Sequence, residues 1–196
     1  TPGSPDSILP AGWTVAQGFI LLGWLSAAYP LAQFLAAPIM GQLADRYGRK
    51  PVLAISILGT AIGYALFAIG LLTKNIPLLF FSRILDGFTG GNISVAQAAI
   101  ADISTPKNRA KNFGLIGMAF GLGFILGPYI GGKLADPSVV SWFSATTPFW
   151  FAAILSLINA CLVLIVLPET LKVKENKRLD LARPFHNIAS AFSVSS

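Results

Sequence analysis

The stretch GQLADRYGRKPV, residues 41–52, lies between two apolar runs that are each long enough to cross a lipid bilayer. It contains one acidic residue, Asp45, and three basic residues, Arg46, Arg49 and Lys50. So much charge between two membrane-length runs predicts a tight connection at a membrane surface. The remainder of the chain indicates which surface this is and what the connection does.

Apolar residues dominate the 196-residue chain, of which 54% is hydrophobic and only 11% is charged. An average soluble domain has about 25% charged residues. Five apolar runs account for the difference, and each has about the 20 residues that span a bilayer as a helix. Helices are expected because an open strand in lipid leaves backbone groups unpaired. We therefore predict an all-α membrane protein with five transmembrane helices at residues 18–43, 52–72, 77–101, 113–134 and 148–167.

Basic residues alternate between the two sides of this predicted bundle. One side holds eleven Lys and Arg residues and the other holds two, while Arg83 lies inside an apolar run. The positive-inside rule places the basic side in the cytoplasm. Residues 1–17 are then an extracytoplasmic segment of a multi-pass cell-membrane protein, and residues 168–196 begin a cytoplasmic loop. This topology explains the net charge of +6 without nucleic acid as a partner.

The two ends of the chain indicate a fragment. A start outside the membrane with neither a signal peptide nor a preceding span has no evident route there. The tail also stops without forming another apolar run. We therefore expect that a preceding helix and a following half are missing from this chain.

Enzymatic or metal chemistry has little support in the composition. The chain contains one histidine, His186, and one cysteine, Cys161. A membrane enzyme or metal site would need paired His, Cys or carboxylate groups near one membrane face. We therefore expect no enzyme activity, no metal site and no cofactor.

The glycines of the opening stretch fit a gating role. Gly41 and Gly48 permit close approach or unusual backbone angles. Asp45 can pair with Arg46 or Arg49, or it can cap a neighbouring helix, whose N-terminus favours negative charge. The bases alone can also be simple topology anchors. The candidate gating residues are Gly41, Asp45, Arg46, Gly48, Arg49 and Lys50.

The third apolar run contains two charged residues on one helical face, Arg83 and Asp86. A charge at the membrane centre costs roughly 2.5–3.5 kcal/mol on insertion scales, so both should face the protein interior or a watery cavity. They can form a structural ion pair or a proton-responsive element in which Asp86 changes its protonation. Polar residues nearby or on the first run are weaker candidates for a substrate pathway: Tyr29, Gln33, Ser94 and Gln97.

The fourth apolar run is rich in glycine on one half of its circumference. Small residues let helix backbones approach closely in membranes, and a proline can add a kink. The candidate helix-packing residues, including one in the third run, are Gly87, Gly114, Gly123, Gly127, Pro128, Gly131 and Gly132.

Three motifs together resemble the major facilitator superfamily. G-x-L-x-D-R-x-G-R-K-x-x-L at residues 41–53 resembles the signature loop between its second and third helices. Arg83 with Gly87 resembles the arginine-plus-glycine motif of its fourth helix, and G-x8-G-x3-G-P-x2-G-G from Gly114 resembles the antiporter motif of its fifth helix. Residues 29–51 and 100–114 are similar to tetracycline-resistance-type exporters, although many of those have an uncharged residue in place of Asp86.

The resemblance implies the N-terminal half of a twelve-helix transporter, with the five spans equivalent to helices two to six. It implies that Asp45 helps to lock the two halves in one access state. The implied function is proton-coupled export of drugs or other small organic molecules by alternating access, with protons, substrate, the lipid bilayer and the missing C-terminal half as partners. A metabolite or sugar carrier of the same superfamily is the alternative, and a non-transporting membrane scaffold or sensor is a more remote one.

Overall fold

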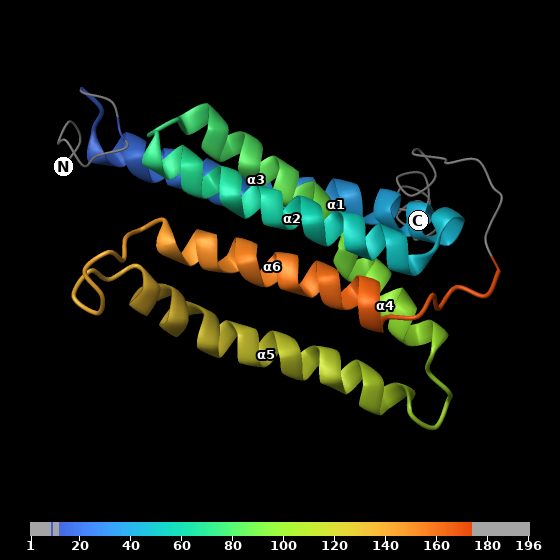
Figure 1. Cartoon of the computed structure of the whole chain (residues 1–196). Coiled ribbons are helices and arrows are strands. Elements are labelled where there is room, and N and C mark those ends of the chain that lie inside the picture. Colours follow the sequence, from blue (N-terminus) through green and yellow to red (C-terminus); the bar gives the residue numbers. More distant parts are fainter. Residues whose placement is uncertain (1–8, 10–11, 174–196) are drawn as a thin grey trace, which may run out of the picture.

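The computed structural model describes residue 9 and residues 12–173, which form six helices and no strand (Figure 1). The predicted tail beyond residue 173 and most of the predicted segment 1–17 lie outside the described residues. The all-α membrane fold predicted from the sequence is confirmed. The helices are α1 (Val15–Tyr47), α2 (Arg49–Leu72), α3 (Ile76–Gly90), α4 (Asn92–Asp102), α5 (Arg109–Leu134) and α6 (Thr147–Val166).

Two helix starts are defined by local side-chain caps. Thr14 Oγ1 accepts a hydrogen bond from the Gln17 N–H at 3.2 Å, and Gln17 Oε1 accepts one from the Thr14 N–H at 2.8 Å. This capping box opens α1. Asn75 Oδ1 accepts from the Leu78 N–H at 3.0 Å and opens α3. Both caps satisfy amides that otherwise lack partners at the start of a helix.

The connection between α1 and α2 consists of Gly48 alone, so both helices extend beyond the predicted spans, which end at residue 43 and begin at residue 52. Asp45 and Arg46 lie in the last turn of α1, whereas Arg49 and Lys50 lie in the first turn of α2. Arginine and lysine are good helix formers, so charge does not end the helix. Gly48 ends it, with φ +115°, a backbone angle that side chains disfavour.

The third apolar run forms two helices in place of the single predicted span. Gly91 separates α3 from α4 with φ −58° and ψ −7°, and its N–H donates to Phe88 O at 3.4 Å. This is a local tightening toward the i→i+3 hydrogen-bonding pattern. Gly91 also packs on α1, where an added Cβ would lie 3.0 Å from Ala37 N. Among the described helices, α1, α2, α5 and α6 are each long and apolar enough to cross a membrane alone.

Close backbone contacts hold α3 between α1 and α2. A Cβ added to Gly63 of α2 would lie 2.9 Å from the Cβ of Asp86, and one added to Gly87 of α3 would lie 2.8 Å from the Cβ of Ala32. These distances are too short for any larger residue without movement of the backbone. Small-residue packing of this kind is typical of membrane helices, and it places the charged part of α3 inside the bundle.

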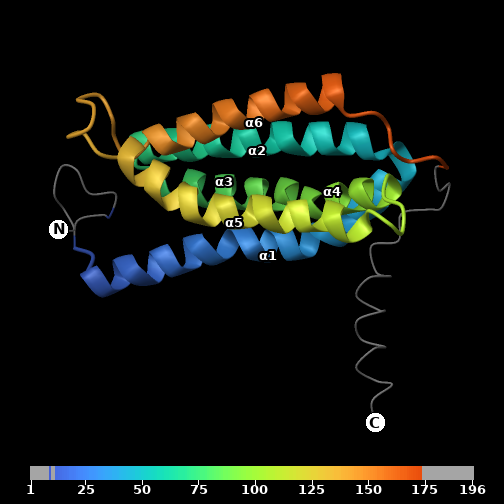
Figure 2. The ribbon, with the colours of Figure 1, turned by 90° about the horizontal axis from the view of Figure 1, so that it is seen from below.

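In contrast, α5 lies at the edge of the bundle and makes only slight contact with α4 and α6 (Figures 1 and 2). None of its residues is buried. The close backbone contact that we expected is not formed with any described helix, because nothing lies within 4 Å of a Cβ added to its glycines. These are Gly114, Gly117, Gly121, Gly123, Gly127, Gly131 and Gly132. A packing role for this face and for Pro128 stays a prediction.

Candidate functional site

Charged side chains from three helices meet beside Gly48, at what we call the hinge end of the bundle. Arg49 Nη1 lies 2.6 Å from Asp45 Oδ1, and Arg49 Nε lies 3.2 Å from Asp102 Oδ2 at the end of α4. Arg49 is 8% exposed, so its guanidinium bridges two carboxylates in a largely buried position. Of the pairings open to Asp45 from the sequence, the structure contains the one with Arg49.

The start of α2 is capped from a distant part of the chain. Gly48 offers no side chain, and the carboxylate of Glu169 accepts hydrogen bonds from the backbone N–H groups of Arg49 at 2.9 Å and Lys50 at 3.3 Å. The Leu171 N–H donates to the same carboxylate at 3.0 Å. Burial raises the pKa of Glu169, but the backbone hydrogen bonds outweigh it and hold this pKa below its ordinary value of 4.5.

Sequence reasoning assigned no role to three members of this network, Asp102, Glu169 and Thr170. Thr170 Oγ1 donates to Asp102 Oδ2 at 3.2 Å, the same oxygen that Arg49 Nε contacts. Asp102 and Glu169 lie 53 and 120 residues from Arg49 in the chain, and no periodic pattern relates such positions. The available signal was that both acids follow apolar runs on the same side of the predicted bundle.

The other predicted gating residues lie outside this network. Arg46 Cζ lies 5.4 Å from the centroid of the Tyr47 ring, a cation–π distance. Among the residues that the structure describes, neither Arg46 nor Lys50 forms a salt bridge through its side chain. Gly41 lies within α1, and nothing is within 4 Å of a Cβ added there. The close approach expected at Gly41 is therefore not formed within the described residues.

The second charged site is the pair Arg83 and Asp86 inside α3. Arg83 Nη2 lies 3.5 Å from Asp86 Oδ2, and Asp86 is 2% exposed. Charge-assisted hydrogen bonds are commonly about 2.7–2.9 Å long, so this contact is loose. Arg83 Nε, Arg83 Nη2 and Asp86 Oδ2 are buried and have no hydrogen-bond partner among the described residues.

Aromatic rings cover the guanidinium of Arg83. Its Cζ lies 4.2 Å from the ring centroid of Phe67 and 5.8 Å from that of Tyr64, both on α2. Phe67 in turn contacts Phe149 of α6, with ring centroids 4.4 Å apart. Cation–π contacts favour a charged guanidinium in a dehydrated setting. In the sequence these aromatic residues are ordinary members of apolar runs. No sequence pattern linked them to Arg83, because helix packing brings them next to it.

A pocket of about 350 Å³ lies between α1 and α4, beside Gly90 and Gly91. Its lining includes three of the predicted pathway residues, Gln33, Ser94 and Gln97. Gln33 Nε2 donates to Gly90 O at 3.0 Å, which fixes one amide at the pocket wall. Tyr29 is not part of the lining, but its hydroxyl lies 2.9 Å from the position of a Cβ on Gly90. The volume falls within the usual range for small-molecule sites.

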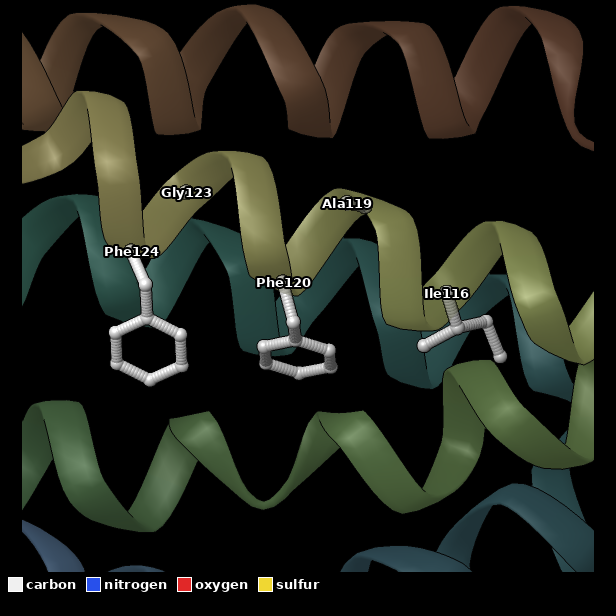
Figure 3. Close-up of a pocket in the computed structure, with 5 residues that line it drawn as sticks. All are labelled: Ile116, Ala119, Phe120, Gly123 and Phe124. Atoms are coloured by element: carbon white, nitrogen blue, oxygen red, sulfur yellow. The ribbon is translucent and has the colours of Figure 1, made fainter.

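A second pocket, of about 370 Å³, lies beside α5 and is lined by Ile116, Ala119, Phe120, Gly123 and Phe124. In Figure 3 the side chains of Ile116, Phe120 and Phe124 point the same way off α5. The lining has no charged residue, so this pocket is an apolar gap beside α5.

A helical membrane bundle with a charged hinge, a buried ion pair and a pocket between helices that includes three polar side chains has the parts of a membrane transporter. The family model described as Major Facilitator Superfamily matches residues 7–195. The chain belongs to this superfamily of membrane transporters, and its fold is that of the N-terminal half of such a transporter. It is a multi-pass membrane protein.

Several named proteins are similar to this chain. The tetracycline resistance protein of class H from Pasteurella multocida is 42% identical over 150 residues, covering 76% of this chain and 35% of that protein. The class B protein from Escherichia coli is 37% identical, covering 86% and 42%. The crystal structure of the human organic anion transporter MFSD10 (TETRAN) matches with a TM-score of 0.69 and 31% identity over 82% of this chain and 36% of that one. The chain thus spans less than half the length of each of these relatives.

Proposed function

We propose that this chain is part of a proton-coupled exporter of drugs or other small organic molecules that works by alternating access. The hinge end is the cytoplasmic side in this proposal, as the distribution of basic residues predicts. The pocket between α1 and α4 contributes to the substrate pathway through its three polar side chains, Gln33, Ser94 and Gln97. The similarity to tetracycline resistance proteins supports drug export.

The observation that carries proton coupling is the half-satisfied ion pair in α3. A guanidinium group cannot be deprotonated in proteins, whereas a carboxylate can gain or lose a proton. The 3.5 Å contact leaves three buried polar atoms without hydrogen bonds within the described chain, and each unmet group costs about 1–3 kcal/mol. Protonation of Asp86 removes one buried charge and releases Arg83. A change of proton occupancy can therefore shift helix packing around α3.

The hinge network supports the gating part of the proposal. Arg49 ties together α1, α2 and α4 through Asp45 and Asp102. A change in the angle at Gly48 has to break or stretch these contacts. We propose that the glycine-rich face of α5 and the apolar gap beside it take helices from other parts of the whole transporter, including its second half.

A second candidate function is the transport of organic anions. Arg83 Nε and Nη2 form the edge of the guanidinium that can bind a carboxylate through two parallel hydrogen bonds. Both nitrogens lack such a bond among the described residues. The structural neighbour MFSD10 is named an organic anion transporter. Under this alternative a substrate anion takes the position opposite Arg83 when Asp86 is protonated.

Flux measurements separate these functions. The transporter expressed from its complete reading frame is reconstituted in proteoliposomes, a pH gradient is imposed, and uptake of tetracycline and of fluorescein, an organic anion, is recorded. Proton-driven uptake of tetracycline supports drug export, and proton-driven uptake of fluorescein alone supports the anion alternative. Transport of either compound that is insensitive to the gradient would remove proton coupling from the proposal.

A further inference from the structure

The carboxylate of Glu169 links two segments that are distant in the sequence. It follows the end of α6 in the chain, yet its oxygens accept from Arg49 N at 2.9 Å and Lys50 N at 3.3 Å, which lie 120 and 119 residues earlier. The Leu171 N–H donates to Oε1 at 3.0 Å and orients the carboxylate from its own side. One anion is therefore held by amides from the exit of α6 and from the start of α2.

Gly48 leaves the space that this carboxylate occupies. A Cβ added to Gly48 would collide with Glu169 Oε2 and would lie 3.0 Å from Glu169 Cδ. Because Gly48 has no side chain, α2 also has no cap of its own, and its first amides need a partner from elsewhere. The hinge glycine thus permits both the tight turn and the entry of a distant carboxylate.

Thr170 makes a second attachment beside the first. Its hydroxyl donates to Asp102, which contacts Arg49, which contacts Asp45. The exit of α6, the end of α4, the start of α2 and the end of α1 are joined within one connected set of contacts. Any rotation of α1 against α2 at Gly48 moves the amides of Arg49 and Lys50, and so moves the partners of Glu169.

We propose that Glu169 is a conformational latch, which caps α2 in one access state and leaves the α2 amides when the hinge at Gly48 reorients. The latch is a positioning residue that acts through the hinge. It rests on the proposed alternating access and adds a residue that neither the signature stretch nor the buried ion pair contains. The competing explanation is a static cap, which holds α2 equally in every state and contributes only to folding.

Side-specific cysteine labelling distinguishes a latch from a static cap. The reporter is Ile93→Cys, which lines the pocket between α1 and α4, in the transporter expressed from its complete reading frame with other reactive cysteines, including Cys161, replaced. A membrane-impermeant maleimide is applied from either side. Glu169→Gln should change the ratio of labelling from the two sides by about two- to fivefold, the effect of a charge at a helix N-terminus. Glu169→Asp, which keeps the charge with a shorter reach, should change it less.

A matched control exists on the opposite end of the bundle. Asp136 Oδ1 accepts from the Ser138 N–H at 2.8 Å in a local turn, and within the described part of the chain its side chain forms no hydrogen bond or salt bridge with a distant helix. Asp136→Asn should leave the labelling ratio unchanged. Gly48→Ala fills the space that the Glu169 carboxylate occupies. It should shift the labelling ratio in the same direction as Glu169→Gln. Where Gly48→Ala fails to fold, Thr170→Val provides the second variant.

The outcomes are separable. An unchanged labelling ratio in Glu169→Gln, together with a lower melting temperature, identifies a static cap and overturns the latch. A shift of the labelling ratio in Asp136→Asn as large as that in Glu169→Gln also overturns the latch. Labelling of wild-type protein from one side only, under all conditions, counts against alternating access itself. The readout needs neither a known substrate nor a proton gradient, so failure of proton-coupled export leaves the latch testable.

Discussion

Two arginine–carboxylate pairs among the described residues, each within four residues along the chain, have similar spacing and opposite surroundings. Asp45 and Arg49 are four residues apart at the hinge, and their 2.6 Å contact sits in a network that also satisfies Asp102, Thr170 and the start of α2. Arg83 and Asp86 are three residues apart inside α3, at 3.5 Å, with three buried atoms lacking hydrogen bonds within the described chain.

This contrast in surroundings indicates what each pair can do. A fully satisfied polar network stabilises the arrangement of helices in which it forms, whereas a buried pair with unmet hydrogen bonds is costly. The hinge network therefore suits the positioning of helices, and the pair in α3 suits a response to protons. Mutations at the two pairs and at the helices around them test this division of roles.

The largest effect is expected at Asp86. Asp86→Asn removes the titratable group and should abolish proton-driven flux while substrate binding stays measurable. The measurement is uptake with and without a pH gradient in proteoliposomes, next to equilibrium binding of the same compound. A purely structural pair behaves differently: both single mutants lose expression, and Arg83→Leu/Asp86→Leu recovers expression and transport together. Proton-dependent transport in that double mutant would refute the division of roles.

The next effect concerns the packing that encloses the pair. Gly87→Ala places a Cβ 2.8 Å from that of Ala32, and overpacking of this kind costs about 1–3 kcal/mol. Expression and melting temperature in detergent should both fall. The matched control is Gly117→Ala on α5, where nothing lies within 4 Å in the described chain. A fall in stability for Gly117→Ala as large as that for Gly87→Ala would indicate that α5 is packed as tightly by segments beyond this chain.

A smaller effect is expected at the hinge. Asp45→Asn leaves Arg49 with Asp102 as its carboxylate partner, so the protein should fold while transport falls several-fold. A shift of about 1 kcal/mol between two access states changes their ratio about fivefold. Surface expression and initial transport rate are the measurements. Unchanged transport together with unchanged cysteine accessibility from both sides would remove Asp45 from the gating mechanism.

The smallest effect is a pH dependence of stability at the hinge. The pKa of Glu169 is lower in the folded protein than its ordinary value of 4.5, so its stabilising contribution is complete above that value and disappears as pH falls through the folded pKa. The difference in melting temperature between wild type and Glu169→Gln should be constant from pH 8 to about pH 5.5 and shrink toward pH 4. A difference that grows on acidification would contradict the assigned hydrogen bonds.

The class of protein and its main motifs could be predicted from the amino-acid sequence. Apolar runs of membrane length predict helices regardless of their neighbours, because the bilayer leaves backbone groups no other partner. The same reasoning singled out the charge of Arg83 and Asp86 inside an apolar run and the charge of residues 41–52. Helix boundaries were less well predicted, since charged residues continued both α1 and α2 up to Gly48.

The contacts between groups that are distant in the sequence could not be predicted in this way, because they depend on the tertiary structure. The contacts of Glu169 with α2, of Asp102 with Arg49 and of Phe67 with Arg83 join segments that no local periodicity relates. The tertiary structure also separated the glycines of α3, which pack within van der Waals distance of α1, from those of α5, which meet nothing within the described residues. The physical reason is the same in each case. Hydrophobicity and backbone hydrogen bonding act along one helix and can be read from one segment, whereas capping, ion pairing and close packing depend on how several helices come together.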